Sequence, residues 1–128
     1  MKKLIAAAVL ALGTAGAAAA DPIEGIWQTQ PDDGAYAHVQ IAPCGNAYCG
    51  TIIRTFNTSG EYKSPNIGKQ LVRSMAPTGG GKYEGKVWRP SNDKIYMGKA
   101  NVSGKNMALS GCVAGGLICA KQAWVKIK

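Results

Sequence analysis

The four cysteines are the residues whose types and spacing could do chemistry. They form two local pairs, Cys44 with Cys49 and Cys112 with Cys119, and each pair encloses a glycine-containing segment. Structural zinc sites usually have CxxC or cysteine–histidine spacing, and the single histidine of the chain is beside neither pair. Four cysteines allow three pairings. Because each pair encloses a turn-rich loop, we predict the disulfides Cys44–Cys49 and Cys112–Cys119 and no metal site.

Side chains that could carry out catalysis form no recognisable set. His38 lies in a strand-like segment, where it shares one face with Tyr36 and Gln40 while the opposite face is apolar. Alternate side chains of a strand point to opposite faces, so we expect His38 to face solvent. The chain has no Gly-x-Ser-x-Gly segment and no two carboxylates at same-face spacing within one strand, arrangements that would have indicated an enzyme. We therefore predict no catalytic residue, no cofactor and no enzymatic activity.

The first twenty residues are typical of a cleavable secretory signal. Lys2 and Lys3 precede an apolar run, Leu4–Leu12, and small residues that end in Ala18–Ala20. The apolar stretch is short for a transmembrane helix, which needs roughly 20 strongly apolar residues. We expect cleavage after Ala20 and a mature protein in the periplasm or the medium that is not an integral membrane protein. Export also favours disulfides over free thiols.

Basic residues outnumber acidic ones, which gives a formal net charge of +8, or +6 without Lys2 and Lys3. They are spread along the chain and form no basic run. The surface should therefore be weakly polycationic and could attract an anionic component of the envelope, such as lipid headgroups, glycans or acidic proteins. We do not expect nucleic acid as a partner, because an exported protein seldom meets it.

Short runs with period-two alternation, separated by Gly, Pro, Asn, Asp and Ser, predict strands and no sustained helix. The polar stretch Asn57–Asn66 is predicted to be a surface loop, and a helix over Ile67–Met75 is the main alternative to a strand there. The eight predicted strands are Glu24–Gln30, Ala35–Ala42, Tyr48–Phe56, Lys69–Met75, Tyr83–Arg89, Lys94–Asn101, Lys105–Gly111 and Ala120–Ile127.

Eight strands joined by short turns predict an all-β domain over residues 21–128, a small antiparallel up-and-down barrel. Closure removes the exposed edges of the sheet, and glycines within the strands allow the coiling that a small barrel needs. An open sandwich of the same strands is the alternative. In a closed barrel Trp27, on the first strand, could close the base, with Lys126 or Lys128 of the last strand over its ring.

Several segments together resemble a known family. They are Asp21–Trp27, Cys44–Gly50, the Trp88-Arg89-Pro90 turn with Tyr96, and the closing segment from Gly111 to Trp124. In these the chain is similar to the small exported Gram-negative family named domain of unknown function 2147. The resemblance implies a lipocalin-like barrel and carries over no catalytic residue. Where many relatives have an acidic Tyr-Asp-Pro turn, this chain has Trp88-Arg89-Pro90, so no role of that acid is transferred.

These observations favour a noncatalytic barrel that binds a small apolar or amphipathic ligand. If Leu71, Arg73 and Met75 share an inward face, they form an apolar wall with one cation, which suits an amphipathic acid. The predicted ligand-binding residues are Tyr36, Arg73, Trp88 and Tyr96. The alternative is an envelope or protein-interaction module whose barrel is packed solid and whose basic exterior and Asn57–Asn66 loop are the working surface.

Overall fold

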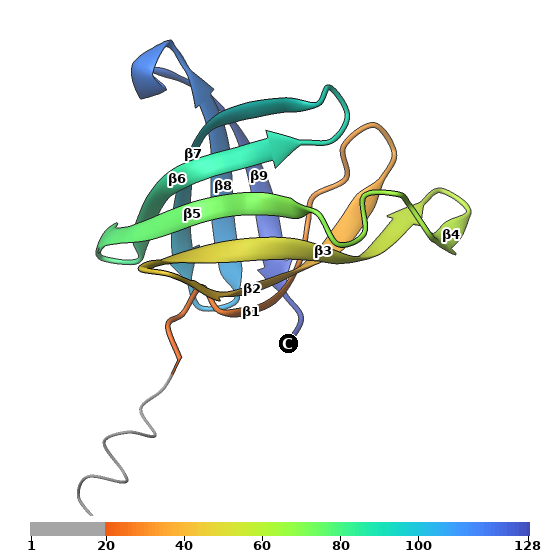
Figure 1. Ribbon diagram of the computed structural model, residues 1–128, viewed down its shortest axis with the longest axis horizontal. Coiled ribbons are helices and arrows are strands. Elements are labelled where there is room, and N and C mark those ends of the chain that lie inside the picture. Colours follow the sequence, from red (N-terminus) through yellow and green to blue (C-terminus); the bar gives the residue numbers. More distant parts are fainter. Residues whose placement is uncertain (1–19) are drawn as a thin grey trace, which may run out of the picture.

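The computed structural model describes residues 20–128, so nearly all of the predicted signal, residues 1–20, lies outside the described residues (Figure 1). The described chain is almost entirely strand, with a single 3-10 turn, η1, at Ala114–Gly116. The strands are β1 (Gly25–Gln28), β2 (Tyr36–Cys44), β3 (Ala47–Asn57), β4 (Gly60–Tyr62), β5 (Gln70–Gly79), β6 (Lys82–Arg89), β7 (Lys94–Ser103), β8 (Asn106–Val113) and β9 (Ile118–Lys126).

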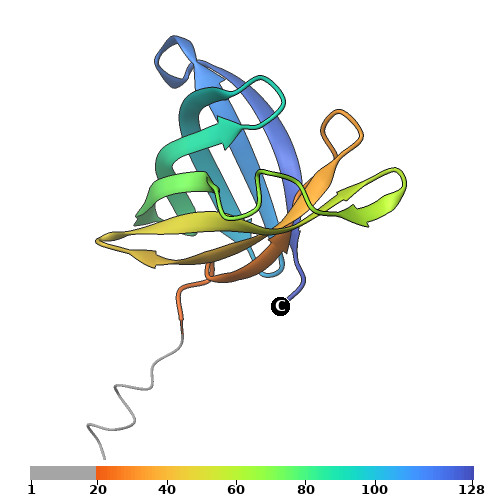
Figure 2. The ribbon, with the colours of Figure 1, turned by 45° about the vertical axis from the view of Figure 1, so that its right-hand side comes forward.

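All strands except β4 form a closed antiparallel barrel in which each strand pairs with its neighbours in sequence (Figures 1 and 2). Closure occurs between β1 and β9, where Trp27 pairs with Lys126 and Gln28 with Val125. Above these pairs the side-chain oxygen of Gln30 accepts a 2.8 Å hydrogen bond from the backbone N–H of Ala123. The predicted eight-stranded up-and-down barrel is therefore confirmed, and the open sandwich is excluded.

Strand β4 lies in the segment predicted to be a loop, and that prediction is wrong in part. β3 continues to Asn57 and turns back, so that Phe56 pairs with Glu61 and Thr55 with Tyr62. An Arg54–Glu61 ion pair of 2.6 Å joins the two strands. All three residues of β4 are exposed, so neither face has the apolar alternation by which a strand is recognised in sequence.

A bulge in β5 changes which of its residues face inward. Ser74 and Met75 together lie opposite Gly85 of β6, and Ser74 has a φ of 50°. An added Cβ on Gly85 would lie 2.5 Å from the Ser74 carbonyl oxygen, so glycine is required there. Such a bulge interrupts the two-residue period. Val72 and Met75 are consequently both buried, and the predicted inward face shared by Leu71, Arg73 and Met75 is wrong.

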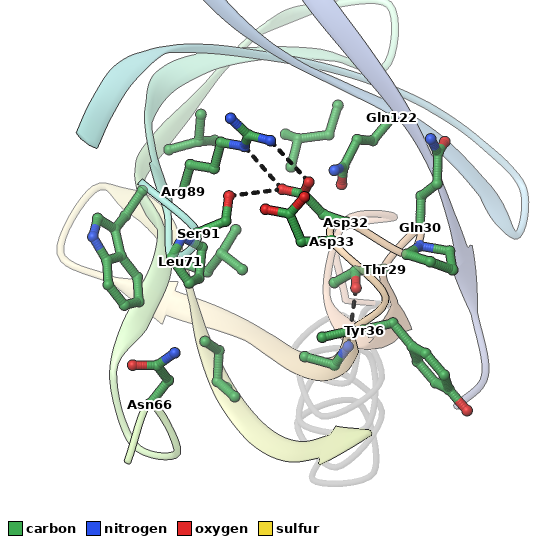
Figure 3. Close-up of a pocket in the computed structure, with 18 of the residues that line it drawn as sticks. Thr29, Gln30, Asp32, Asp33, Tyr36, Asn66, Leu71, Arg89, Ser91 and Gln122 are labelled. Carbon is green, nitrogen blue, oxygen red and sulfur yellow. Dashed lines mark hydrogen bonds and ion pairs between the residues drawn. The ribbon is translucent and has the colours of Figure 1, made fainter. Parts of the chain in front are cut away.

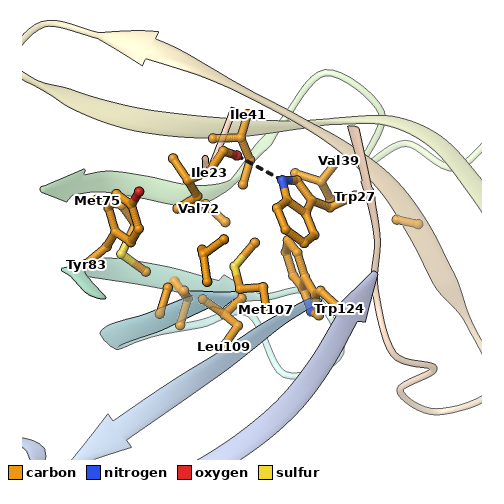
Figure 4. Close-up of a cluster of buried hydrophobic side chains, with 14 of the residues drawn as sticks. Ile23, Trp27, Val39, Ile41, Val72, Met75, Tyr83, Met107, Leu109 and Trp124 are labelled. Carbon is orange, nitrogen blue, oxygen red and sulfur yellow. Dashed lines mark hydrogen bonds between the residues drawn. The ribbon is translucent and has the colours of Figure 1, made fainter. Parts of the chain in front are cut away.

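A cluster of buried hydrophobic side chains lies inside the barrel (Figure 4), and its base is at the end where both termini of the described chain lie in Figure 1. Trp27 and Trp124 are 0% and 1% exposed, and Ile23 covers the base, its carbonyl accepting a 2.9 Å hydrogen bond from the Trp27 indole. Lys126 Nζ lies 5.2 Å from the centre of the Trp27 ring. The predicted cation over Trp27 is therefore confirmed, with Lys126 as its source.

Both predicted disulfides are present, Cys44–Cys49 and Cys112–Cys119, with Cα–Cα distances of 5.7 and 4.1 Å. The first lies in the β2–β3 hairpin and the second joins β8 to β9. These hairpins are at opposite ends of the barrel, so each bridge stabilises one hairpin rather than joining distant parts of the chain.

Candidate functional site

The end of the barrel opposite the core is open and contains a cavity of about 740 Å³ (Figure 3). Its inner wall is apolar, because the inward residues of four strands are Ile52, Val87, Leu109 and Trp124. Around the mouth the lining becomes polar, with Gln30, Asp32, Asn66, Arg89, Ser91 and Gln122. We call this space the mouth cavity. An apolar interior with a few polar groups at one end is the usual form of a small-molecule site.

An ion pair between Asp32 and Arg89 crosses the mouth. Arg89 donates two hydrogen bonds of 2.9 Å, one from Nε and one from a terminal guanidinium nitrogen, to the two carboxylate oxygens of Asp32. The Ser91 hydroxyl lies 3.3 Å from the same carboxylate. The hydrogen bonds from the Arg89 guanidinium are the main reason why the pKa of Asp32 lies below its ordinary value. Two parallel bonds make this the geometry with which arginine recognises carboxylates in general.

The β1–β2 connection places Asp32 over the mouth. Asp32 and Ala35 are bridge partners, and the two residues between them, Asp33 and Gly34, have φ values of 55° and 76°. Positive φ at both central positions defines the turn type that fits the twist of a hairpin, and Asp-Gly is a preferred sequence for it. This Asp33-Gly34 turn directs the Asp32 carboxylate towards β6.

Two threonine side chains deep in this half of the barrel are already hydrogen-bonded to the backbone. The Thr29 hydroxyl accepts the backbone N–H of Ala37, and the Thr55 hydroxyl accepts that of Ser64. Within residues 20–128 no buried side-chain nitrogen or oxygen lacks a hydrogen-bond partner. The polar groups that remain accessible to a ligand are therefore those at the mouth, and Arg89, with 45% of its side chain exposed, is the prominent cation among them.

Tyr96 is the predicted ligand residue that most clearly belongs to the mouth cavity. It pairs with Val87 across β6 and β7, and its ring lies beside Gly111, whose added Cβ would be 3.4 Å from Tyr96 Cβ. Its hydroxyl accepts a 2.8 Å hydrogen bond from the Asn92 side chain at the mouth. Glycine at position 111 leaves open the space next to this ring.

Tyr36 and Trp88 reach only the edge of the mouth cavity. The Tyr36 ring points away from the Asp32–Arg89 pair (Figure 3) and stacks on Phe56, with ring centres 4.8 Å apart. Trp88 follows the inward residue Val87, and its indole N–H donates to Asp93 at 2.8 Å. The Trp88 ring is covered by the cations of Lys69 and Arg73, 5.5 and 5.9 Å from its centre.

Arg73 is not part of the mouth cavity. It follows the buried residue Val72 and therefore points outward, where its guanidinium lies over Trp88 and its Nε donates to the Gln70 carbonyl at 3.0 Å. The cation that pairs with Asp32 at the mouth is Arg89, which stood out in the sequence only as a departure from the resembling family. The two-residue alternation from Tyr83 through Val87 would have placed Arg89 on the inward face.

His38 lies on the outer surface, as its alternation with buried Ala37 and Val39 predicted. Its ring is near Phe56, with centres 4.7 Å apart, and its Nε2 is 3.1 Å from the side-chain oxygen of Gln28. Desolvation in this setting, followed by the nearby Arg54 charge, lowers the pKa of His38 below its ordinary value. His38 is not among the residues that line the mouth cavity.

Within residues 20–128 no three His, Cys, Asp or Glu side chains gather as a metal site would require. In the same part of the chain there is no helix with the length and apolar character needed to cross a bilayer.

Comparison with known proteins agrees with this architecture. The family model described as "Uncharacterized protein conserved in bacteria (DUF2147)" matches residues 25–126. A solved structure described as "Protein HP1028 from the human pathogen Helicobacter pylori belongs to the lipocalin family" has a TM-score of 0.67 and 14% sequence identity, and the match covers 83% of each chain. At this identity the likeness shows the fold alone, which is lipocalin-like. No curated protein matches the chain.

Proposed function

The chain belongs to the DUF2147 family of proteins conserved in bacteria, and we propose that it is a noncatalytic, exported binding protein. Its lipocalin-like barrel takes up one small amphipathic molecule through the open end. The apolar part of the ligand lies in the mouth cavity, and its polar head stays at the mouth, beside Arg89.

The contrast between the two halves of the barrel carries this proposal. Trp27, Met75 and other large side chains fill one half, whereas about 740 Å³ remains open in the other. That volume lies within the range of roughly 300–1,000 Å³ typical of small-molecule sites. An eight-stranded barrel is just wide enough to be filled by side chains or to hold one small ligand, and here the small inward residues Gly111 and Ala37 leave room beside Leu109 and Ile52.

The position of Arg89 favours a ligand with an anionic head group. Its two-pronged contact with Asp32 is the contact that it would make with a carboxylate of the ligand, and nearly half of its side chain is exposed. A ligand acid therefore competes with Asp32 for one guanidinium. The neighbouring Ser91 and Gln122 can supply further hydrogen bonds to the head group.

Export fits the two disulfides, because such bonds persist in oxidising compartments. The predicted signal, residues 1–20, gives the same location from an independent part of the sequence. Both observations support our proposal that the protein acts in the periplasm or the medium. A packed barrel acting only through its surface is the weaker candidate, because it leaves the open volume without a role.

Native mass spectrometry of protein purified from its own bacterium tests the proposal. We expect a fraction of the protein to carry one added small-molecule mass that is released by organic solvent. The matched control is the same protein refolded from denaturant, which should lack that mass. Protein that carries no added mass and binds no amphipathic acid when offered one would contradict the proposal.

A further inference from the structure

The hairpin of β8 and β9 extends beyond the mouth and ends in exposed apolar residues. In Figures 1 and 2 this hairpin, drawn in blue, projects past the neighbouring β6–β7 hairpin. Val113, Leu117 and Ile118 at its end are 49%, 87% and 64% exposed. We call these three residues with η1 the apolar tip. Single exposed apolar residues are ordinary, but three on one projecting turn form a patch of the kind that marks an interaction site.

The apolar tip continues the wall of the mouth cavity. Along β8, Leu109 and Gly111 line the cavity, and Val113 is the next residue on the same face. Along β9, Ile118 precedes Ala120, which also lines the cavity, and Ile118 pairs directly with Val113. One face of the hairpin therefore runs without a charged side chain from the interior of the barrel to its outermost turn.

The apolar tip is held in place before any partner binds. The Cys112–Cys119 disulfide joins the two strands immediately below it. Lys99 of β7 donates a 3.4 Å hydrogen bond from Nζ to the carbonyl oxygen of Gly116, and Gly116 also lies against Met97. Because the turn is already fixed, little conformational entropy is lost when its side chains become buried against a partner.

The charged side chains of β7, β8 and β9, the strands that carry and adjoin the apolar tip, are all basic. Between Lys94 and Lys128 the sequence has no aspartate or glutamate. Lys99 and Lys121 lie on either side of Ser110, with which both pair across the sheet, so two cations flank the base of the hairpin. An apolar end flanked by lysines matches the interface of an anionic bilayer, where apolar side chains enter below the headgroups and lysines meet the phosphates.

From this arrangement we propose that the apolar tip docks the protein on an anionic phospholipid surface, with the mouth of the barrel facing that surface. Docking itself does not depend on the proposed function. Only its use, the exchange of an amphipathic molecule between the bilayer and the mouth cavity, rests on that function.

Cosedimentation of the purified protein with vesicles tests the docking. We expect binding to vesicles of phosphatidylcholine and phosphatidylglycerol, much weaker binding to phosphatidylcholine alone, and loss of binding as salt is raised. The double variant Leu117→Ser/Ile118→Ser should bind anionic vesicles at least about tenfold more weakly. The control Val125→Ser/Ile127→Ser, which changes two residues that are 48% and 46% exposed elsewhere on β9 and after it, should bind as the wild type does.

A second variant reports insertion directly. In Leu117→Trp the apolar character is kept, so anionic vesicles should shift its fluorescence to the blue and brominated lipid should quench it. Absence of binding to anionic vesicles at low salt, or equal binding by the Leu117→Ser/Ile118→Ser variant, would overturn the proposal. So would a dimer in solution that this variant dissociates, because a second copy would then cover the apolar tip. The Leu117→Ser/Ile118→Ser variant should still bind an apolar probe in solution. This measurement distinguishes a failure of membrane docking from a failure of the proposed ligand binding.

Discussion

Arg89 and Asp32, 57 residues apart in sequence, meet across the mouth of the barrel in a two-pronged ion pair (Figure 3). The pair joins the end of β6 to the β1–β2 connection, which is also held to β9 by the hydrogen bond between Gln30 and Ala123. It also places one guanidinium at the mouth cavity with a carboxylate that a ligand can replace. The same two residues thus order the entrance and give it a preference for an anionic head group.

This arrangement predicts a selectivity change on substitution of Asp32. Asp32→Asn removes the internal competitor for Arg89. Dodecanoate should therefore bind more tightly to this variant than to the wild type, whereas dodecanol should bind about equally to both. Arg89→Met should weaken the binding of dodecanoate and leave the affinity for dodecanol nearly unchanged. Displacement of a fluorescent apolar probe measures all four affinities at pH 7. Equal effects on the acid and the alcohol would show that Arg89 does not contact the head group.

Trp27→Ala should be severely destabilising, because this fully buried side chain fills the base of the barrel. Truncation of a buried tryptophan costs about 3–5 kcal/mol, and denaturant unfolding would measure the loss. Lys126→Met, which keeps the alkyl stem but removes the cation over the ring, should lower the free energy of unfolding by only about 0.5–1 kcal/mol. A melting temperature of Trp27→Ala within a few degrees of wild type would contradict the role of Trp27.

His38 should titrate below the ordinary value of 6.5, because its partial burial and the Arg54 charge lower its pKa. Unfolded protein then binds the proton more readily than folded protein. The contribution of His38 to stability is therefore present above pH 6.5 and is lost as the pH falls through the lower folded pKa. As the only histidine in the sequence, it gives unambiguous imidazole NMR signals. A midpoint at or above 6.5 would be inconsistent with this environment.

Peptide mapping without reduction should yield only the Cys44–Cys49 and Cys112–Cys119 linked peptides. Because each bridge closes a short loop, replacing either pair by serines should cost about 2 kcal/mol, at the low end for disulfides. A peptide linking Cys44 to Cys112, or Cys49 to Cys119, would be incompatible with the barrel described here.

Much of the barrel could be predicted because its strands follow simple alternation. Ala37, Val39 and Ile41 all face the core, as their spacing indicated, and the turn at Asp33-Gly34 has the backbone that its residues favour. Cysteine pairing was equally accessible, since hairpin partners are close in sequence. These features depend on local sequence alone.

The site was harder to predict because it depends on exceptions to alternation and on contacts between distant residues. The bulge at Ser74 shifts the period of β5 by one residue and leaves Arg73 outside, over Trp88. Arg89 becomes the cation at the mouth only when the β1–β2 connection brings Asp32 to it. Neither the bulge nor this long-range pair has a distinct local sequence pattern.

The central claim, a ligand site in the open half of the barrel, is tested most directly by filling the mouth cavity. Gly111→Leu adds a side chain beside Tyr96, where the glycine leaves space, whereas Ser110→Leu adds the same side chain to the outer face of the same strand. Titration with the apolar fluorescent probe N-phenyl-1-naphthylamine should give saturable one-to-one binding for wild type and Ser110→Leu. Folded Gly111→Leu should bind at least about tenfold more weakly. No saturable binding by wild type, or equal binding by folded Gly111→Leu, would contradict the claim.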